Sequence, residues 1–258
     1  MHRALITGGT SGIGAAFARA LARRGVDLVL VARDQTRLDA VASEVAAAYG
    51  VHVETMSADL SDRSAVDRVV ARIESDHDPV DFFVCNAGFS LRDDLLARDV
   101  SGHDLGFEVM VRAVFVLAGA AGRAMSARGR GWIVITSSTS GYVTQNNYSA
   151  VKAWTTNYSE ALHNRLRGTG VQVTALCPGW VRTEFHARAG ISGTSIPSFL
   201  WMDPDRVVEE CLADVARGKV ISIPGRRYKV MIALLRHAPR RLVRKLSAKL
   251  SDRRARER

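Results

Sequence analysis

The stretch SSTSGYVTQNNYSAVK, residues 137–152, places a phenol, an ammonium and two adjacent hydroxyls where they could act together. Tyr148 and Lys152 are four residues apart, which puts them on one face of a helix and one turn from each other. A phenol has an ordinary pKa near ~10 and is a poor acid at neutral pH, but a neighbouring cation lowers that pKa. The spacing therefore indicates a tuned proton donor, although an ordinary helix start would also fit these residues.

A glycine-rich segment, ITGGTSGIGAAFARAL, follows the first expected strand and opens the first expected helix. Gly8, Gly12 and Gly14 allow a tight turn, close backbone approach and close packing of the helix on the sheet. The free N–H groups and the dipole at the start of a helix suit a pyrophosphate. The spacing is Gly-x3-Gly-x-Gly, so its position at a strand–helix junction, more than the pattern alone, favours a nucleotide site.

The second expected strand ends in LVLVARD, with Ala32 and then Arg33 where a cofactor's adenosine ribose would lie. Folds that bind NAD usually carry a carboxylate at this position, whereas an arginine accommodates the 2′-phosphate of NADP. Arg33 therefore favours NADP(H), unless it is only a solvated surface charge. Asp34 weakens this preference unless it serves to cap the next helix.

These groups need a scaffold, and apolar strand-like runs alternate with helical patterns along the chain. Several of the strands are apolar throughout, which is typical of a sheet covered on both faces. The alternation predicts an α/β fold with a Rossmann-type, doubly wound parallel sheet in a single domain, residues 1–225. The expected strands are 3–7, 27–32, 51–57, 80–88, 131–138 and 171–179, and the later expected helices are 35–49, 62–76 and 102–127, with another through the 137–152 motif.

Five motifs in order make residues 3–225 resemble the short-chain dehydrogenase/reductase (SDR) family. They are TGGTSGIG (7–14), ADL (58–60), NAG (86–88), YSAVK (148–152) and PGWVRT (178–183). The resemblance implies hydride transfer between a nicotinamide and a carbonyl or alcohol, with Tyr148 as general acid/base, Lys152 as its tuner and Ser138 binding the reacting oxygen. It also implies a cofactor site formed by Gly8, Thr10, Ser11, Gly12, Ile13, Gly14, Arg33, Asp59, Leu60, Asn86, Ala87, Gly88, Tyr148, Lys152, Pro178, Gly179, Val181 and Thr183.

The chain departs from the family pattern at two places. The gap between the serine pair and Tyr148 is shorter than in many relatives, which leaves Ser137 as an alternative to Ser138. Met110, in FEVMVRAVF, stands where the family places an asparagine that is thought to hold a water of a proton relay. A thioether is a poor substitute, so a second class stays open: a catalytically weak or inactive dinucleotide-binding sensor or regulator.

The net charge of +10 comes from residues 226–258, which carry 13 Lys/Arg and 2 Asp/Glu. Leucines at 242, 246 and 250 alternate with basic residues after Pro239, which predicts a basic amphipathic helix. We therefore expect a C-terminal extension, 226–258, that contacts an anionic membrane surface at its periphery. The alternatives are a helix packed on the domain with a solvated basic face, or a disordered end. Nucleic acid is not an expected partner, because no groove-reading motif accompanies the charge.

The remaining sequence features indicate where in the cell the protein acts and how it is assembled. Cys85, Cys177 and Cys211 are widely spaced and match no metal pattern, which is typical of reduced, buried thiols in a cytoplasmic protein. Neither a transmembrane run nor a secretory signal is expected. Residues 180–201 mix Gly, Pro, Ser and large apolar side chains, as in a mobile lid over an apolar substrate. The resemblance further implies a homodimer or homotetramer paired through the helix at 102–127.

Overall fold

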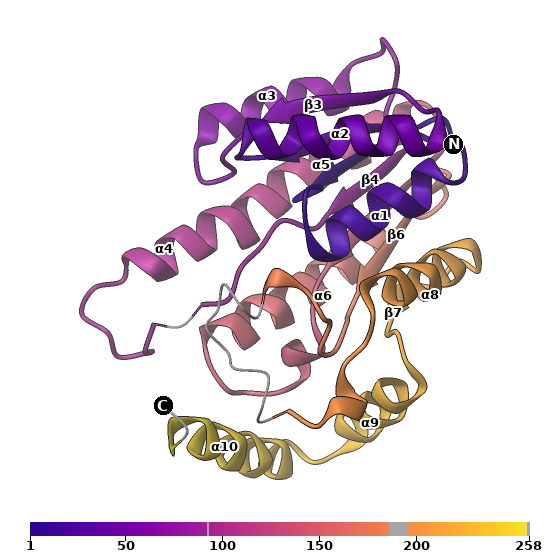
Figure 1. The fold of residues 1–258 in the computed structure, drawn as a ribbon. Helices are drawn as coiled ribbons and strands as arrows, with labels where there is room; N and C mark the ends of the chain where they lie inside the picture. Colours follow the sequence, from indigo (N-terminus) through magenta and orange to yellow (C-terminus); the bar gives the residue numbers. More distant parts are fainter. Residues whose placement is uncertain (92, 186–195, 257–258) are drawn as a thin grey trace.

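The carboxyl ends of seven parallel strands form one edge of the domain in the computed structural model (Figure 1). The structure describes residues 1–91, 93–185 and 196–256, and side chains up to residue 248. The strands lie in the order β3-β2-β1-β4-β5-β6-β7. They are β1 Arg3–Thr7, β2 Asp27–Ala32, β3 Val53–Ser57, β4 Phe82–Cys85, β5 Gly131–Thr136, β6 Val171–Leu176 and β7 Ile221–Ser222. This is the expected doubly wound sheet, with β7 added as a strand too short to predict from its sequence.

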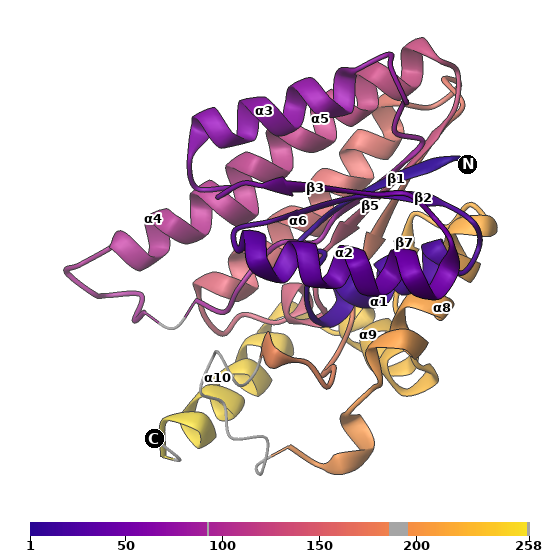
Figure 2. The ribbon, with the colours of Figure 1, turned by 45° about the horizontal axis from the view of Figure 1, so that its top comes forward.

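The helices connect these strands across both faces of the sheet. They are α1 Gly12–Ala22, α2 Gln35–Tyr49, α3 Arg63–Glu74, α4 Ser101–Phe107, α5 Ala113–Ala127, α6 Asn147–Arg165, α8 Pro204–Ala216, α9 Arg226–His237 and α10 Arg240–Arg256, with short turns η1 Glu108–Arg112, η2 Thr139–Tyr142 and η4 Ser198–Leu200. Figure 2 shows α3 and α5 on one side of the sheet and α1 and α2 on the other.

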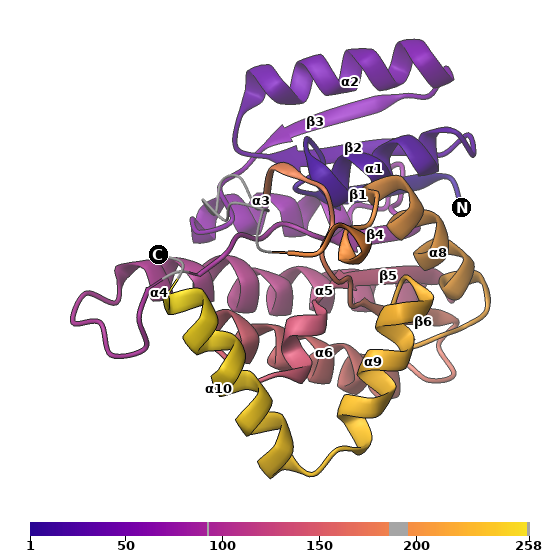
Figure 3. The same ribbon diagram turned by 60° about the horizontal axis from the view of Figure 1, so that its bottom comes forward.

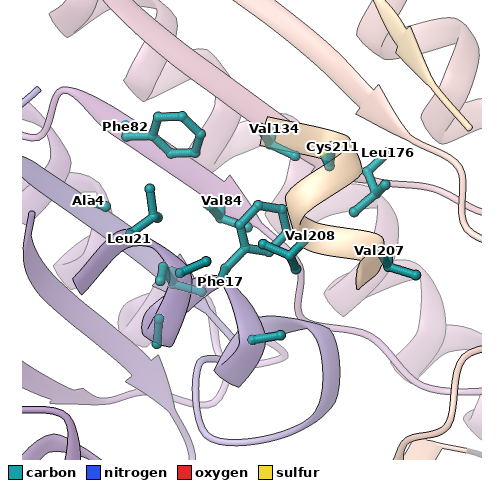
Figure 4. Close-up of a cluster of buried hydrophobic side chains, with 14 of the residues drawn as sticks. Ala4, Phe17, Leu21, Phe82, Val84, Val134, Leu176, Val207, Val208 and Cys211 are labelled. Atoms are coloured by element: carbon teal, nitrogen blue, oxygen red, sulfur yellow. The ribbon is translucent and has the colours of Figure 1, made fainter. Parts of the chain in front are cut away.

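Two hydrophobic cores, one on each face, hold the layers together. In β4, Phe82 and Val84 face the core that α1 and α8 cover, while Phe83 and Cys85 face the core under α3 and α5. Figure 4 shows the first core, where side chains from α1 and α8 meet over the strands. The fully apolar strands therefore bury both faces, as their sequences predict.

Two of the predicted strands are longer than the strands of the structure, mainly at their carboxyl ends. The run at 80–88 is paired only over Phe82–Cys85, and the run at 171–179 only over Val171–Leu176. Residues beyond these pairs continue as loops at the sheet edge. Because β1 lies between β2 and β4, the chain reverses its winding direction there, and such switch points are where doubly wound folds bind ligands.

The long helix expected at 102–127 is interrupted. Residues Glu108–Arg112 form a π turn between α4 and α5, and Met110 lies in that turn with 1% of its side chain exposed. The run Ser101–Ala127 is nevertheless long and apolar enough to cross a membrane by length and mean hydropathy (1.7), contrary to the sequence expectation. Half of that window is buried in the fold, and the core helix of a globular domain passes the same test.

The C-terminal residues form two helices that lie against the domain. Figure 3 shows α9 and α10 joined in a V on the face that comes forward from the bottom of Figure 1. Tyr228 and Ile232 of α9 and Val243 of α10 are buried. The boundary at 225/226 stays a prediction, as does the lid expected at 180–201, because residues 186–195 lie outside the described part of the chain.

Candidate active site

The glycine turn between β1 and α1 is built around close backbone contacts. Gly8 and Gly12 have φ angles of 67° and 52°, a region that side chains other than glycine rarely adopt. A Cβ on Gly14 would lie 2.0 Å from the Gly8 carbonyl oxygen, so the first turn of α1 sits directly on the turn. Ser11 occupies the N-cap position of α1, but its side chain makes no capping hydrogen bond. The first N–H groups of the helix therefore receive no acceptor from Ser11.

Asn86, in the NAG motif, joins the ends of three strands. Its backbone N–H donates to Thr7 Oγ1 at 2.9 Å and its side-chain Nδ2 donates to the Thr7 carbonyl at 3.2 Å. Its Oδ1 accepts a hydrogen bond from Thr136 Oγ1 at 3.3 Å. Thr7 also accepts from the Ala87 N–H at 3.1 Å, so it serves as the hub of this junction. Thr7 belongs to the TGGTSGIG motif, but its position in the sequence predicted no role for its side chain.

The loop PGWVRT comes to the same place from β6. The Pro178 carbonyl accepts from the Thr139 N–H at 3.0 Å, and Gly12 faces Thr183, whose Cβ would be 3.1 Å from a Cβ on Gly12. Gly179 lies against the ring of Tyr228, whose hydroxyl accepts from the Trp180 N–H at 3.0 Å. Val181 is buried beside Met202, with which it forms a β-bridge. The structure thus brings the first, third and fifth motifs together.

Arg33 and Asp59 lie at the ends of adjacent strands, β2 and β3. Both side chains are exposed, and the Ser57 hydroxyl ties the two ends together by donating to the Arg33 carbonyl at 3.0 Å. Asp34 accepts a hydrogen bond from the Arg37 N–H at 3.0 Å and so caps α2. Capping was the second of the two roles that the sequence left open for Asp34, the first being a carboxylate that binds the ribose of NAD. Asp59 accepts from the Ser61 N–H at 2.9 Å and shapes its turn, with Leu60 buried behind it.

Arg37 was not singled out in the sequence, yet it connects two parts of the site. Its Nε donates to the Thr10 carbonyl at 3.1 Å, and its guanidinium pairs with Glu184 at 2.5 Å. The pair raises the pKa of Arg37, chiefly through the hydrogen bond to Glu184. Only the fold reveals this contact, since the two partners are 147 residues apart.

Tyr148, Ser138 and Lys152 meet at the carboxyl edge of β5. Lys152 Nζ donates to the Thr136 carbonyl at 2.8 Å and lies 5.6 Å from the centre of the Tyr148 ring. Asn146 caps α6 by accepting from the Ser149 N–H at 3.0 Å, which fixes where the helix begins and hence where Tyr148 points.

The ionisation of Tyr148 differs from the sequence expectation. Burial raises the pKa of Tyr148 above its ordinary value, and a hydrogen bond with Ser138 only partly offsets this. Lys152, which was expected to lower that pKa, directs its ammonium to the Thr136 carbonyl. Burial lowers the pKa of Lys152 to about 8.

The serine pair divides between the interior and the site. Ser137 Oγ donates to the Lys152 carbonyl at 2.7 Å and lies 2.7 Å from Thr156 Oγ1, so it faces into the protein. Ser138 Oγ accepts from the Ser140 N–H at 3.0 Å and reaches Tyr148. The structure therefore brings Ser138 to Tyr148 and turns Ser137 toward the interior.

The depressed pKa of Lys152 predicts a pH-dependent contribution to stability. Between about pH 8 and the ordinary lysine range near ~10.4, the unfolded chain holds a proton that the folded protein has released. The contribution of Lys152 to the free energy of unfolding should therefore rise with pH in this window, whereas the buried cysteines, whose pKa burial raises, act in the opposite direction in both proteins compared below. Relative to Lys152→Met, we expect a gain of on the order of 3 kcal/mol across it, measured by urea unfolding at several pH values. Parallel stability curves for the two proteins would contradict the assignment, because the other titrating groups are common to both.

Comparison with known proteins identifies the family. A family model of short chain dehydrogenases matches residues 2–191. The chain is 34% identical to gluconate 5-dehydrogenase of Gluconobacter oxydans over 189 residues, 72% of this chain and 73% of that one. A short-chain dehydrogenase from Sphingobium yanoikuyae, solved in complex with NADPH, is 33% identical with a TM-score of 0.85, covering 94% of this chain and 95% of that chain. The bulky-bulky ketone specific alcohol dehydrogenase of Comamonas testosteroni is 27% identical with a TM-score of 0.79, covering 99% and 92%.

The chain belongs to the short-chain dehydrogenase family. The Rossmann-type sheet, the glycine turn at its switch point and the family match together define an oxidoreductase that acts on alcohol or carbonyl groups. The three cysteines are buried and free, as expected. Among the described residues, no group of His, Cys, Asp and Glu could hold a metal ion.

Proposed function

We propose that the protein transfers a hydride between NADP(H) and a carbonyl or secondary alcohol, with Tyr148 as the general acid/base. The observation that carries this proposal is the placement of Tyr148, with Ser138 and Lys152 beside it, at the carboxyl edge of the sheet that also carries the glycine turn. The residues fit a dinucleotide: the turn has no room for a side chain at Gly14, and the start of α1 offers N–H groups that Ser11 does not cap.

In this proposal each side chain has a separate task. The bound nicotinamide supplies or accepts the hydride. Tyr148 donates its phenolic proton to the carbonyl oxygen during reduction and takes it back during oxidation. Ser138 donates a hydrogen bond to the same oxygen as negative charge develops on it. Lys152 holds the nicotinamide ribose and, when charged, stabilises the phenolate form of Tyr148. The other residues of the cofactor list shape the walls of the dinucleotide site.

Arg33 is the residue we assign to the 2′-phosphate of NADP(H). Charge-assisted hydrogen bonds from a guanidinium contribute about 1.5–3 kcal/mol, so Arg33→Ala should lower kcat/KM with NADPH about 50-fold. The value with NADH should change less than about threefold, because NADH lacks that phosphate. Steady-state kinetics with both cofactors measure this, and Arg165→Ala, an exposed arginine at the far end of α6, is the control. Equal losses with both cofactors would show that Arg33 has another role.

The surroundings of Tyr148 favour an apolar substrate. The ring of Phe185 lies 6.0 Å from that of Tyr148, and Tyr148 packs against the buried cluster of Leu91, Met110 and Val151. The structurally similar alcohol dehydrogenase specific for bulky-bulky ketones is in line with this, whereas the gluconate dehydrogenase acts on a polar compound. We infer a lipophilic ketone or aldehyde, or the corresponding alcohol.

Turnover measurements test the proposal directly. NADPH oxidation should be seen with at least one bulky apolar ketone or aldehyde, followed by stopped-flow absorbance at the NADPH band. The panel should include hydrophilic keto acids and ketoses, which should react more slowly. Tight NADPH binding with no turnover on the whole panel would contradict the enzyme and favour the dinucleotide-binding sensor that Met110 left open.

We further propose a homodimer or homotetramer and a cytoplasmic location. Phe115, on α5, has 58% of its side chain exposed, and it lies beside Tyr158 of α6, which in turn stacks on Trp154. A partly exposed aromatic cluster across two helices supports pairing with another copy.

A further inference from the structure

The helix α9 has apolar side chains on two sides, and only one side meets the domain. Tyr228 and Ile232 are buried, with 4% and 1% of their surfaces exposed. Val230 and Leu234 are 61% and 70% exposed, and Met231 is 39% exposed. Together with Arg226, Arg227 and Leu235 these outward residues line an open groove. Packing on the domain therefore leaves an apolar strip of α9 in contact with solvent.

The helix α10 repeats this arrangement. Val243 is buried, and Ser247 Oγ accepts a hydrogen bond from the Thr144 N–H at 3.0 Å, which fixes one side of the helix on the domain. Leu242 and Leu246, one turn apart, are 47% and 44% exposed. We call the outward residues of both helices the α9–α10 platform: Arg226, Arg227, Val230, Met231, Leu234, Arg236, Arg240, Arg241, Leu242, Arg244, Lys245 and Leu246. Figure 3 shows the two helices on one face, diverging from the turn that joins them.

The charge of the platform selects the partner. The platform carries seven Lys/Arg and no Asp/Glu, and the remaining basic residue of 226–248, Lys229, is paired with Glu210. A second copy of the same surface would repel it, and a nucleic acid would leave the leucines, methionine and valine in water. Basic side chains around exposed aliphatic ones match a bilayer that contains anionic lipids, where the aliphatic groups enter the interface and the cations meet the headgroups. We propose that the α9–α10 platform docks the protein on an anionic membrane surface.

The platform is fastened to the loops of the active site. Ser247 of α10 accepts a hydrogen bond from the N–H of Thr144, four residues before Tyr148. The hydroxyl of Tyr228 in α9 accepts from the Trp180 N–H in the PGWVRT loop and donates to the Leu200 carbonyl at 2.6 Å. Phe199 is 60% exposed, and the Arg227 guanidinium lies 5.2 Å from its ring. Docking would hold these loops beside the lipid, where an apolar carbonyl compound is concentrated. The docking itself does not depend on the proposed function.

Vesicle binding tests the docking without any turnover. The full-length protein should cosediment with vesicles of phosphatidylcholine containing about one third phosphatidylserine, and far less with phosphatidylcholine alone. Arg241→Gln with Arg244→Gln should lower the partition coefficient roughly tenfold, since each Lys/Arg at such a surface contributes about fivefold or less. Leu234→Gln with Leu246→Gln should lower it by a similar factor through lost apolar insertion. High salt should weaken the wild type as the charge variant does.

The matched control is Arg165→Gln with Arg167→Gln, which removes the same charge from exposed positions near the opposite edge of the sheet. This variant should bind as the wild type does, and thermal unfolding should show that all variants fold. Binding that ignores phosphatidylserine, or equal losses in the control and the platform variants, would overturn the proposal. So would a platform variant that leaves vesicle binding intact and instead dissociates an oligomer in sedimentation velocity, since the platform would then be an interface between copies.

Discussion

Tyr148→Phe is expected to lower kcat for carbonyl reduction about 10³-fold and to leave the fold and NADPH binding nearly unchanged. Removing a general acid typically costs about 10²–10⁴-fold, because no other group delivers the proton to the reacting oxygen. Ser138 hydrogen-bonds with Tyr148, but its aliphatic hydroxyl is a weaker acid than a phenol and is a poor replacement as proton donor. The phenol lies over the apolar cluster of Leu91, Met110 and Val151, so Phe should fill the same space.

Tyr158→Phe provides the control for this prediction. Tyr158 lies on the same helix and donates its hydroxyl to the Phe115 carbonyl at 3.2 Å, on the outer side away from the site. Its loss should change kcat less than about twofold, and fluorescence titration should give the same Kd for NADPH in both variants. A Tyr148→Phe protein that keeps a tenth or more of the wild-type kcat would show that another residue protonates the product.

The pattern of apolar residues was enough to predict the sheet and the position of the glycine turn. In β4, four consecutive apolar residues indicated a strand covered on both faces, and the structure confirms this because all four are buried. The glycines could be placed because their reason is local: a tight turn and the start of a helix. What the sequence could not show was how far each strand stays paired, since pairing depends on the neighbouring strand.

Contacts between residues far apart in the chain were the main part of the site that the sequence left open. The ion pair of Arg37 with Glu184 and the junction of Thr7 with Asn86 join segments 147 and 79 residues apart, and no spacing rule applies over such distances. The choice between Ser137 and Ser138 was open for the same reason. It depends on Thr156, one turn beyond Lys152, which takes the Ser137 hydroxyl into the interior.

At Met110 the sequence predicted the burial of the side chain but not the conformation of the backbone. A methionine in a helix is usually a core residue, and the structure agrees, since it packs against Leu91 and Val151. The π turn around it could not be predicted from residue types. Such turns are frequent at functional sites, and this one brings the Met110 sulfur to within 3.3 Å of the position that a Cβ on Gly88 would take, in the cofactor motif. Met110 is therefore buried beside Gly88 of the NAG motif.

The C-terminal helices illustrate why periodicity alone cannot decide which face of a helix meets a domain. The four-residue spacing of Leu242 and Leu246 correctly predicts that they share a face. The structure turns that face outward, and the less conspicuous pair of Val243 and Ser247 meets the domain. Only the partner surface at Thr144 determines this choice.

Gly14→Ala is expected to abolish measurable NADPH binding and to lower the free energy of unfolding by about 3 kcal/mol, the upper part of the usual range for overpacking. A Cβ at this position would lie 2.0 Å from the Gly8 carbonyl oxygen and 2.7 Å from Asn86 Nδ2. The first contact is with backbone, which cannot rotate away, so α1 must move off the turn. That displacement takes the N–H groups at the start of α1 away from the pyrophosphate.

Gly119→Ala tests whether the effect is specific to the turn. Gly119 lies within α5, and the nearest atom to its Cβ would be Arg123 Nη1 at 3.6 Å, so alanine fits without a clash. This variant should be as stable as the wild type or more stable by up to about 1 kcal/mol, because alanine favours a helix over glycine. Thermal unfolding with and without NADPH measures both effects: the wild type and Gly119→Ala should gain Tm on adding NADPH, and Gly14→Ala should not. If Gly14→Ala folds and gains as much Tm as the wild type, the pyrophosphate does not rest on the start of α1, and the cofactor site must be placed elsewhere on the sheet edge.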